Sequence, residues 1–177
     1  MIPEHGRPDP GNHIVGLTNR NPFNLVQYCL NDPWFGSVRP FMDSVNRHAI
    51  FDREEYAVCA YSRHLYRCRW MPADRFPKVT VAALIDTQAP ADHAGNDPNA
   101  YASFIEGRLG LVSGGPFVLH SRTGAVADTA LLIGFMRAVA EYEILAGWRL
   151  DGTIVLNGLV MYNHRVAESK YRIEPVG

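Results

Sequence analysis

Residues 55–71, EYAVCAYSRHLYRCRWM, decide the fold that the sequence predicts. We expect them to form one long strand, in which alternate side chains share a face. The face suited to a core then carries most of the bulky aromatic side chains. The opposite face gathers the cationic ones, so that a strip rich in arginine and tyrosine is predicted there, formed by Tyr61, Arg63, Arg67 and Arg69.

Further segments indicate more strands. Residues 78–86, KVTVAALID, are apolar on both faces, as in a central strand, and residues 116–122, PFVLHSR, suit another short one. Residues 154–162, IVLNGLVMY, consist of two apolar runs joined by Asn157–Gly158, a strong hairpin signal. A second turn at 168–170 would complete a C-terminal β-meander.

Helices are expected between these strands. Asn21–Pro22 and Asp97–Pro98 both place a capping residue before a proline, which predicts a short helix after residue 22 and another from 98 to about Leu109, ended by Gly110. A weaker helix is predicted at 39–48. The longest, at 124–145, is apolar around so much of its surface that a sheet of the chain would cover one side and a partner subunit the other.

The elements together predict an α+β fold. We expect a single domain with a largely antiparallel sheet of about 5–6 strands, a long central helix and the C-terminal β-meander. Residues 1–22 contain four prolines and three glycines and are predicted to form an extended N-terminal arm, which leaves 23–177 as the domain. Pro8 and Pro10 of the arm are candidate contacts with a neighbouring chain.

Composition limits the classes of function. With 177 residues, 47% of them hydrophobic, the chain has enough apolar side chains for a core, and its net charge of −1 creates no general attraction to nucleic acid or membranes. Three cysteines without a CxxC spacing indicate neither a disulfide framework nor a zinc site, so no metal or cofactor is predicted. The start of the chain does not resemble a signal peptide, and charged residues interrupt its longest apolar tract, near 125–146. The chain is therefore expected in a cytoplasmic setting or in an assembled particle such as a virion.

The arginine-rich strip has three interpretations. It suits an interface with another protein chain, a surface that binds nucleic acid, or a solvated face whose arginines pair with local carboxylates. The near-neutral total charge and the lack of a binding motif count against nucleic acid.

The sequence also offers one candidate small-molecule site. Residues 117–128, FVLHSRTGAVAD, predict a strand, a turn and the start of a helix. His120 and Ser121 are candidate catalytic residues, and Arg122, Thr123 and Gly124 would hold an anion at the helix N-terminus. In the alternative interpretation, Ser121 or Thr123 only caps the helix. A catalytic His120 should line an open pocket, whereas a buried one would count against this site.

The prediction for function is therefore a structural or assembly subunit that contacts copies of itself or other chains through its arm and its arginine-rich strand. Virion head, neck and tail components are one setting with such needs. The alternatives are a small hydrolase or anion-binding enzyme acting at His120–Gly124, and a nucleic-acid-binding module.

Overall fold

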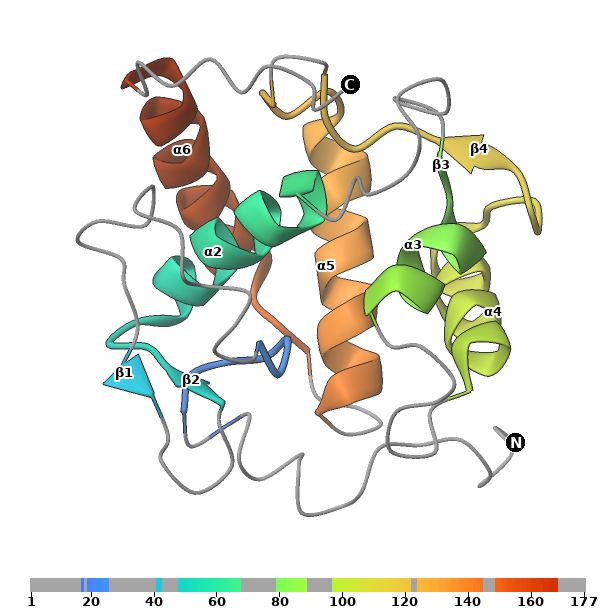
Figure 1. The fold of residues 1–177 in the computed structure, drawn as a ribbon, viewed down its shortest axis with the longest axis horizontal. Coiled ribbons are helices and arrows are strands. Elements are labelled where there is room, and N and C mark those ends of the chain that lie inside the picture. Colours follow the sequence, from blue (N-terminus) through green and yellow to red (C-terminus); the bar gives the residue numbers. More distant parts are fainter. Residues whose placement is uncertain are drawn as a thin grey trace.

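The structure is a computed structural model, which describes residues 17, 19–25, 41–42, 48–67, 79–88, 97–121, 124–144 and 149–168. Helices make up most of this part of the chain (Figure 1). They are α2 (Glu54–Arg67), α3 (Val81–Gln88), α4 (Pro98–Leu109), α5 (Thr129–Glu143) and α6 (Gly152–Glu168). The strands are β1 (Phe41–Met42), β2 (Ala49–Ile50), β3 (Val79–Thr80) and β4 (Pro116–Phe117).

The predicted α+β fold with an antiparallel sheet of five or six strands is wrong. Within the described ranges the strands form two separate antiparallel pairs, β1 with β2 and β3 with β4, and each strand is two residues long. Ladders this short are too small to form a layer of the core. Helix packing therefore has to supply the core.

Residues 54–67 form the helix α2 where we predicted a strand over 55–71. Val58, Tyr61 and Leu65, all buried, recur at spacings of three and four, which places them on one side of a helix. Glu54 and Glu55 occupy the first turn, where carboxylates interact favourably with the helix dipole. Residues 68–71 of the predicted strand lie outside the described residues.

The predicted C-terminal hairpin is also a helix, α6. The buried residues Val155, Gly158, Leu159 and Tyr162 repeat at helical spacing. Asp151 begins the helix, because its side chain accepts a hydrogen bond of 2.6 Å from the Thr153 amide. Residues 169–177, where the β-meander would have ended, lie outside the described part.

The other two predicted strands, over 78–86 and 116–122, are also wrong for most of their described residues. Residues 81–88 form α3, and Thr80 caps it by accepting a hydrogen bond from the Ala83 amide at 3.1 Å. Of 116–121, the described part of the strand predicted over 116–122, only Pro116–Phe117 is a strand. Residues 22–25, predicted to be helical, form a turn and an irregular segment in which Asn24 has a left-handed φ of 48°. Residues 41–42, within the weaker predicted helix, form β1.

Two helix predictions are confirmed. Helix α4 runs from Pro98 to Leu109, with Asp97 accepting hydrogen bonds from the amides of Asn99 and Ala100, and with Gly110 in the left-handed conformation at φ 64°. Helix α5 confirms the long helix, although it begins at Thr129.

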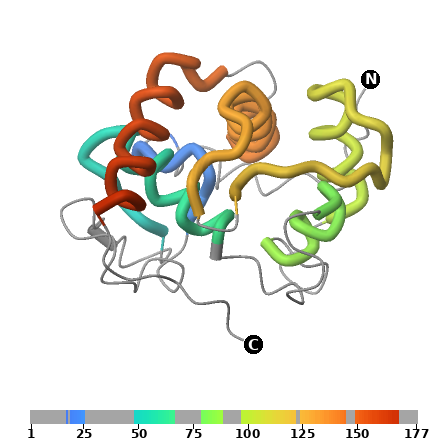
Figure 2. The backbone as a smooth tube through the Cα atoms, turned by 90° about the horizontal axis from the view of Figure 1, so that it is seen from above, coloured from blue at the N-terminus to red at the C-terminus, as the bar shows by residue number. Residues whose placement is uncertain are grey.

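Helix α5 lies at the centre, with α2 and α6 on one side and α3 and α4 on the other (Figures 1 and 2). Arg108 of α4 forms an ion pair with Glu141 of α5, and the ring of Tyr101 stacks on that of Tyr142 at 3.8 Å between centroids. The chain's own helices thus bury much of the apolar surface of α5 for which we had expected a partner. The buried residues of α5 are Leu132, Phe135, Met136, Ala138, Val139 and Ala140.

The segment before β1 is attached to the body of the protein. Asn21 is fully buried, and its side-chain amide donates to the carbonyl oxygens of Leu25 and Ala49 at 3.0 and 3.1 Å. The amide of Phe51 donates to the carbonyl of Asn19 at 2.9 Å. Residues 1–16 of the predicted arm, including Pro8 and Pro10, lie outside the described residues, so for them the arm stays a prediction.

Candidate functional site

The predicted small-molecule site lies in a tight turn between β4 and α5. His120 forms an antiparallel bridge with Val126, and the Ser121 amide donates to the carbonyl of Ala125 at 2.8 Å. The hydroxyl of Tyr162 on α6 donates to the carbonyl of Gly124 at 2.6 Å, and this hydrogen bond links the turn to α6.

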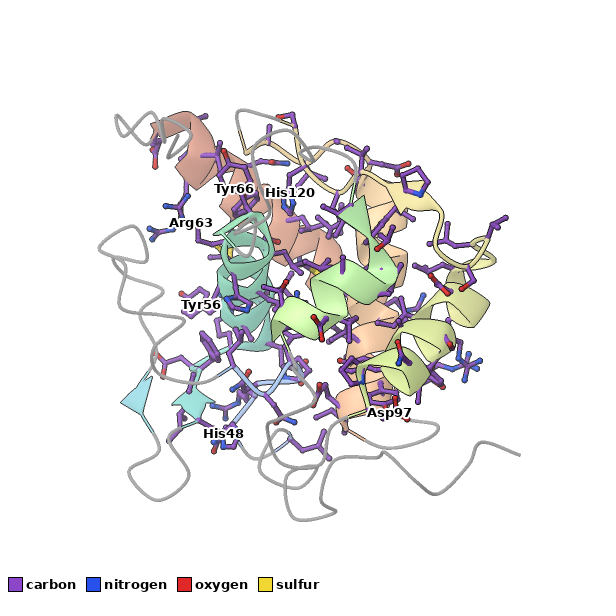
Figure 3. The ribbon with its side chains drawn as sticks, turned by 45° about the vertical axis from the view of Figure 1, so that its right-hand side comes forward. His48, Tyr56, Arg63, Tyr66, Asp97 and His120 are labelled. Carbon is purple, nitrogen blue, oxygen red and sulfur yellow. The ribbon has the colours of Figure 1, made fainter. Side chains whose placement is uncertain are left out.

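His120 is buried against aromatic side chains. Only 4% of it is exposed, and its ring centroid lies 5.8 Å from that of Tyr66 and 5.5 Å from that of Tyr162. Figure 3 labels His120 and Tyr66 side by side. Its Nε2 atom has no hydrogen-bond partner among the residues that the structure describes. Burial lowers the pKa of His120 to about 4, so that the imidazole is neutral near pH 7. An imidazole this enclosed has little surface to offer a substrate, which argues against the enzyme interpretation.

The predicted anion site does not coincide with a helix N-terminus. Helix α5 begins at Thr129, five residues after Gly124, and Asp128 caps it by accepting a hydrogen bond of 2.9 Å from the Leu131 amide. A carboxylate at the cap would repel an anion. The amide of Gly124 donates to the carbonyl of Ser121, whereas Arg122 and Thr123 lie outside the described residues.

Two of the predicted interface residues, Tyr61 and Arg63, are buried in the chain itself. The ring of Tyr61 stacks on Phe23 at 4.2 Å between centroids, and its hydroxyl hydrogen-bonds to Gln88 at 2.7 Å. Arg63 is 6% exposed. The helix thus removes the strand face on which the strip was predicted. The side chain of Arg67, and the whole of Arg69, lie outside the described part.

Other reactive side chains do not gather into a site in the described ranges. No three His, Cys, Asp or Glu side chains come together there as metal ligands would. The thiol of Cys59 is buried, which raises its pKa to about 12 and disfavours the nucleophilic thiolate. None of the described helices is long and apolar enough to cross a membrane.

A candidate contact surface lies on α6, at the edge of the molecule in Figures 1 and 2. The helix buries one side against α2, whereas its other side is exposed and includes Leu156 and Val160, which are 44% and 61% exposed. These two apolar side chains lie one helical turn apart. We call this surface the α6 outer face, and its exposed residues are Thr153, Leu156, Asn157, Val160, Asn163, His164 and Ala167.

The sequence analysis missed the α6 outer face because it assigned residues 154–162 to a hairpin. The signal that could have revealed it was the spacing of Val155, Gly158, Leu159 and Tyr162, which defines a buried side and therefore an opposite one.

No protein-family model matches the chain, and the search of curated proteins finds no match.

Proposed function

We propose that this protein is a structural or assembly subunit that associates with copies of itself. The observation that carries the proposal is the pair Leu156 and Val160, exposed one turn apart on a helix whose opposite side is packed into the chain. Covering the exposed part of each side chain would contribute on the order of 1 kcal/mol. Exposed apolar residues that lie together, rather than scattered singly, are typical of contact surfaces.

The near-neutral chain supports assembly in a second way. With a net charge of −1, copies of the chain repel one another little through their overall charge. A ring, shell or tube, such as a virion head, neck or tail, is one setting in which such contacts repeat. Any contribution of residues 1–16 to these contacts remains part of the proposal.

The alternatives have less support. An enzyme at His120 would have to act through a side chain that is 4% exposed, and Arg63, one of the three arginines predicted to bind nucleic acid, is buried. The described part of the chain therefore favours assembly over either of them.

The mass of the full chain in solution tests the proposal. Native mass spectrometry and light scattering, over a concentration series from the submicromolar to the high micromolar range, should show a dimer or larger oligomer that grows with concentration. A monomer at every concentration would overturn the proposed function.

A further inference from the structure

His120 occupies a site that suits only the neutral form of its ring. The ring lies between those of Tyr66 on α2 and Tyr162 on α6, and almost none of the residue is exposed. In the imidazolium both ring nitrogens are donors, whereas Nε2 is buried and has no hydrogen-bond partner among the described residues. Contact with aromatic rings stabilises a cation, but it does not replace the hydrogen bonds that an imidazolium makes in water.

Within the described part of the chain, no negative charge compensates for that burial. The groups that titrate beside the ring are the two phenols. Arg63 of α2, whose charge acts on Tyr162, and Arg165, three residues after Tyr162 on α6, are both positive. The nearest described carboxylate along the chain, Asp128, caps α5 instead, and the pKa of His120 is lowered by burial.

The segment that carries His120 is a surface turn attached to α6. We call residues 119–121 and 124–127 the His120 turn. Three hydrogen bonds between backbone groups lie within it. Two others join it to α6, since the Tyr162 hydroxyl donates to the carbonyl of Gly124 and the Asn163 side chain accepts from the Val126 amide at 3.2 Å.

Opening of the His120 turn would hydrate the imidazole without disturbing the helix core. Gly124 lies on the ring of Tyr66, so close that a Cβ on the glycine would come within 3.0 Å of that ring. Lifting the turn breaks this contact and the two hydrogen bonds to α6, whereas Leu132 and Phe135 of α5, both fully buried, need not move. This local step exposes far less apolar surface than unfolding of the whole domain, so it accommodates the proton at a lower cost.

We infer that the His120 turn is a pH-sensitive latch, which separates from α2 and α6 when His120 binds a proton, while the helices stay packed. The latch is closed near neutral pH and opens as the solution becomes acidic. Opening uncovers the rings of Tyr66 and Tyr162. The latch does not depend on the proposed function, so a monomeric chain would leave it standing.

Hydrogen exchange of the full chain, followed by NMR at pH 7 and pH 4, measures the opening. The amides of Ser121, Gly124 and Ala127 report on the turn, because each donates within it, and those of Leu132 and Ile144 report on α5. The opening constant of the turn, corrected for intrinsic exchange rates, should rise by about 100-fold or more from pH 7 to pH 4. The reason is that the open form binds a proton near pH 6.5 and the closed form only near pH 4.

The amides of α5 distinguish a latch from unfolding of the whole domain. They should show a smaller opening constant that rises clearly with urea, whereas that of the turn should hardly respond to low urea concentrations, because its opening exposes little surface. Turn amides with the opening constant and the urea dependence of α5 would overturn the inference.

Two histidine variants identify the group that titrates. His120→Phe should abolish the rise of the opening constant at low pH. His164→Phe is the matched control and should keep it, because His164 is exposed on α6 and pairs with Glu168. A rise that persists in His120→Phe would show that another group opens the turn, and the latch would be wrong.

Tyr162→Phe tests the latch with the histidine in place, and so serves even if His120→Phe does not fold. It removes the hydroxyl that donates to Gly124 and should raise the opening constant of the turn about tenfold at both pH values. An unchanged opening constant would mean that α6 does not hold the turn closed, which also overturns the inference.

Discussion

A Cβ atom placed on Gly158 of α6 would lie 2.5 Å from the Cβ of Val58 on α2, which is closer than two such carbons can approach. The carbonyl oxygen of Glu55 would lie 2.8 Å away. The glycine is therefore required where the two helices meet, and its role is close packing rather than a turn.

We predict that Gly158→Ala destabilises the protein by about 1–3 kcal/mol, because α2 and α6 would have to move apart. Gly107→Ala is the matched control: Gly107 also lies within a helix, but a Cβ there would meet no atom within 4 Å. It should raise the free energy of unfolding by about 0.5–1 kcal/mol through helix propensity. Urea denaturation of the two variants at one protein concentration makes the comparison, and equal effects would contradict the close approach of the two helices.

The same glycine explains why the fold could be predicted only in part. Asn157–Gly158 has the residues of a hairpin turn, and only the position of Val58, far away in sequence, shows that the helix needs a residue without a side chain. Over 55–71 both an alternating and a helical pattern fit, and tertiary packing selects the helix. By contrast, Asp97 and Pro98 at the start of α4 and Gly110 at its end act within that helix alone. For that reason α4 was predicted correctly.

Whether a candidate site residue is expected on the surface depends on the secondary structure that the sequence was predicted to form there. Tyr61 and Arg63 would lie on an exposed face if residues 55–71 formed a strand. In the helix α2 both residues are buried. His120 and Ser121 are in the turn where the sequence placed them, but the burial of His120 depends on Tyr66 and Tyr162, which come from two other elements. The contact surface proposed on α6 could not have been predicted from a hairpin.

The fully buried side chain of Asn21 should be among the strongest polar determinants of stability. It makes three hydrogen bonds: it donates to the carbonyls of Leu25 and Ala49, and it accepts from the Leu25 amide at 3.0 Å. Asn21→Ala would leave these buried backbone groups unpaired and should lower the free energy of unfolding by about 3 kcal/mol. Chemical denaturation measures the change.

Asn99→Ala is the control for this prediction, because Asn99 is exposed in the first turn of α4. Its replacement should change the free energy of unfolding by less than about 0.5 kcal/mol. A loss for Asn21→Ala no larger than that of the control would show that residues 19–25 contribute little to the fold.

The buried His120 should make stability depend on pH. Burial lowers its pKa in the folded chain to about 4 from an ordinary value of 6.5, so between these values the unfolded chain binds a proton that the folded chain does not. Stability should therefore fall as the pH is lowered from 6.5 to 4, by roughly 3 kcal/mol from this group. His120→Phe, which keeps an aromatic ring between Tyr66 and Tyr162, should remove that part of the slope. Thermal denaturation of both chains at a series of pH values tests this, and parallel curves would contradict it.

Cys59 should resist alkylation in the folded chain. Its side chain is fully buried in α2, and that burial raises its pKa from 9.0 to about 12, although the positive charge of Arg165 acts in the opposite direction. At pH 8 the thiolate population should be about a thousandfold smaller than in an unfolded chain, because the shift spans about three pH units. Exclusion of the reagent from the core slows the reaction further. The rate can be followed with iodoacetamide and mass spectrometry of the peptide that contains Cys59, with the same chain in urea as the reference. Modification of the native protein at the reference rate would mean that α2 opens readily from α6, and would contradict the tight packing at Val58 and Gly158.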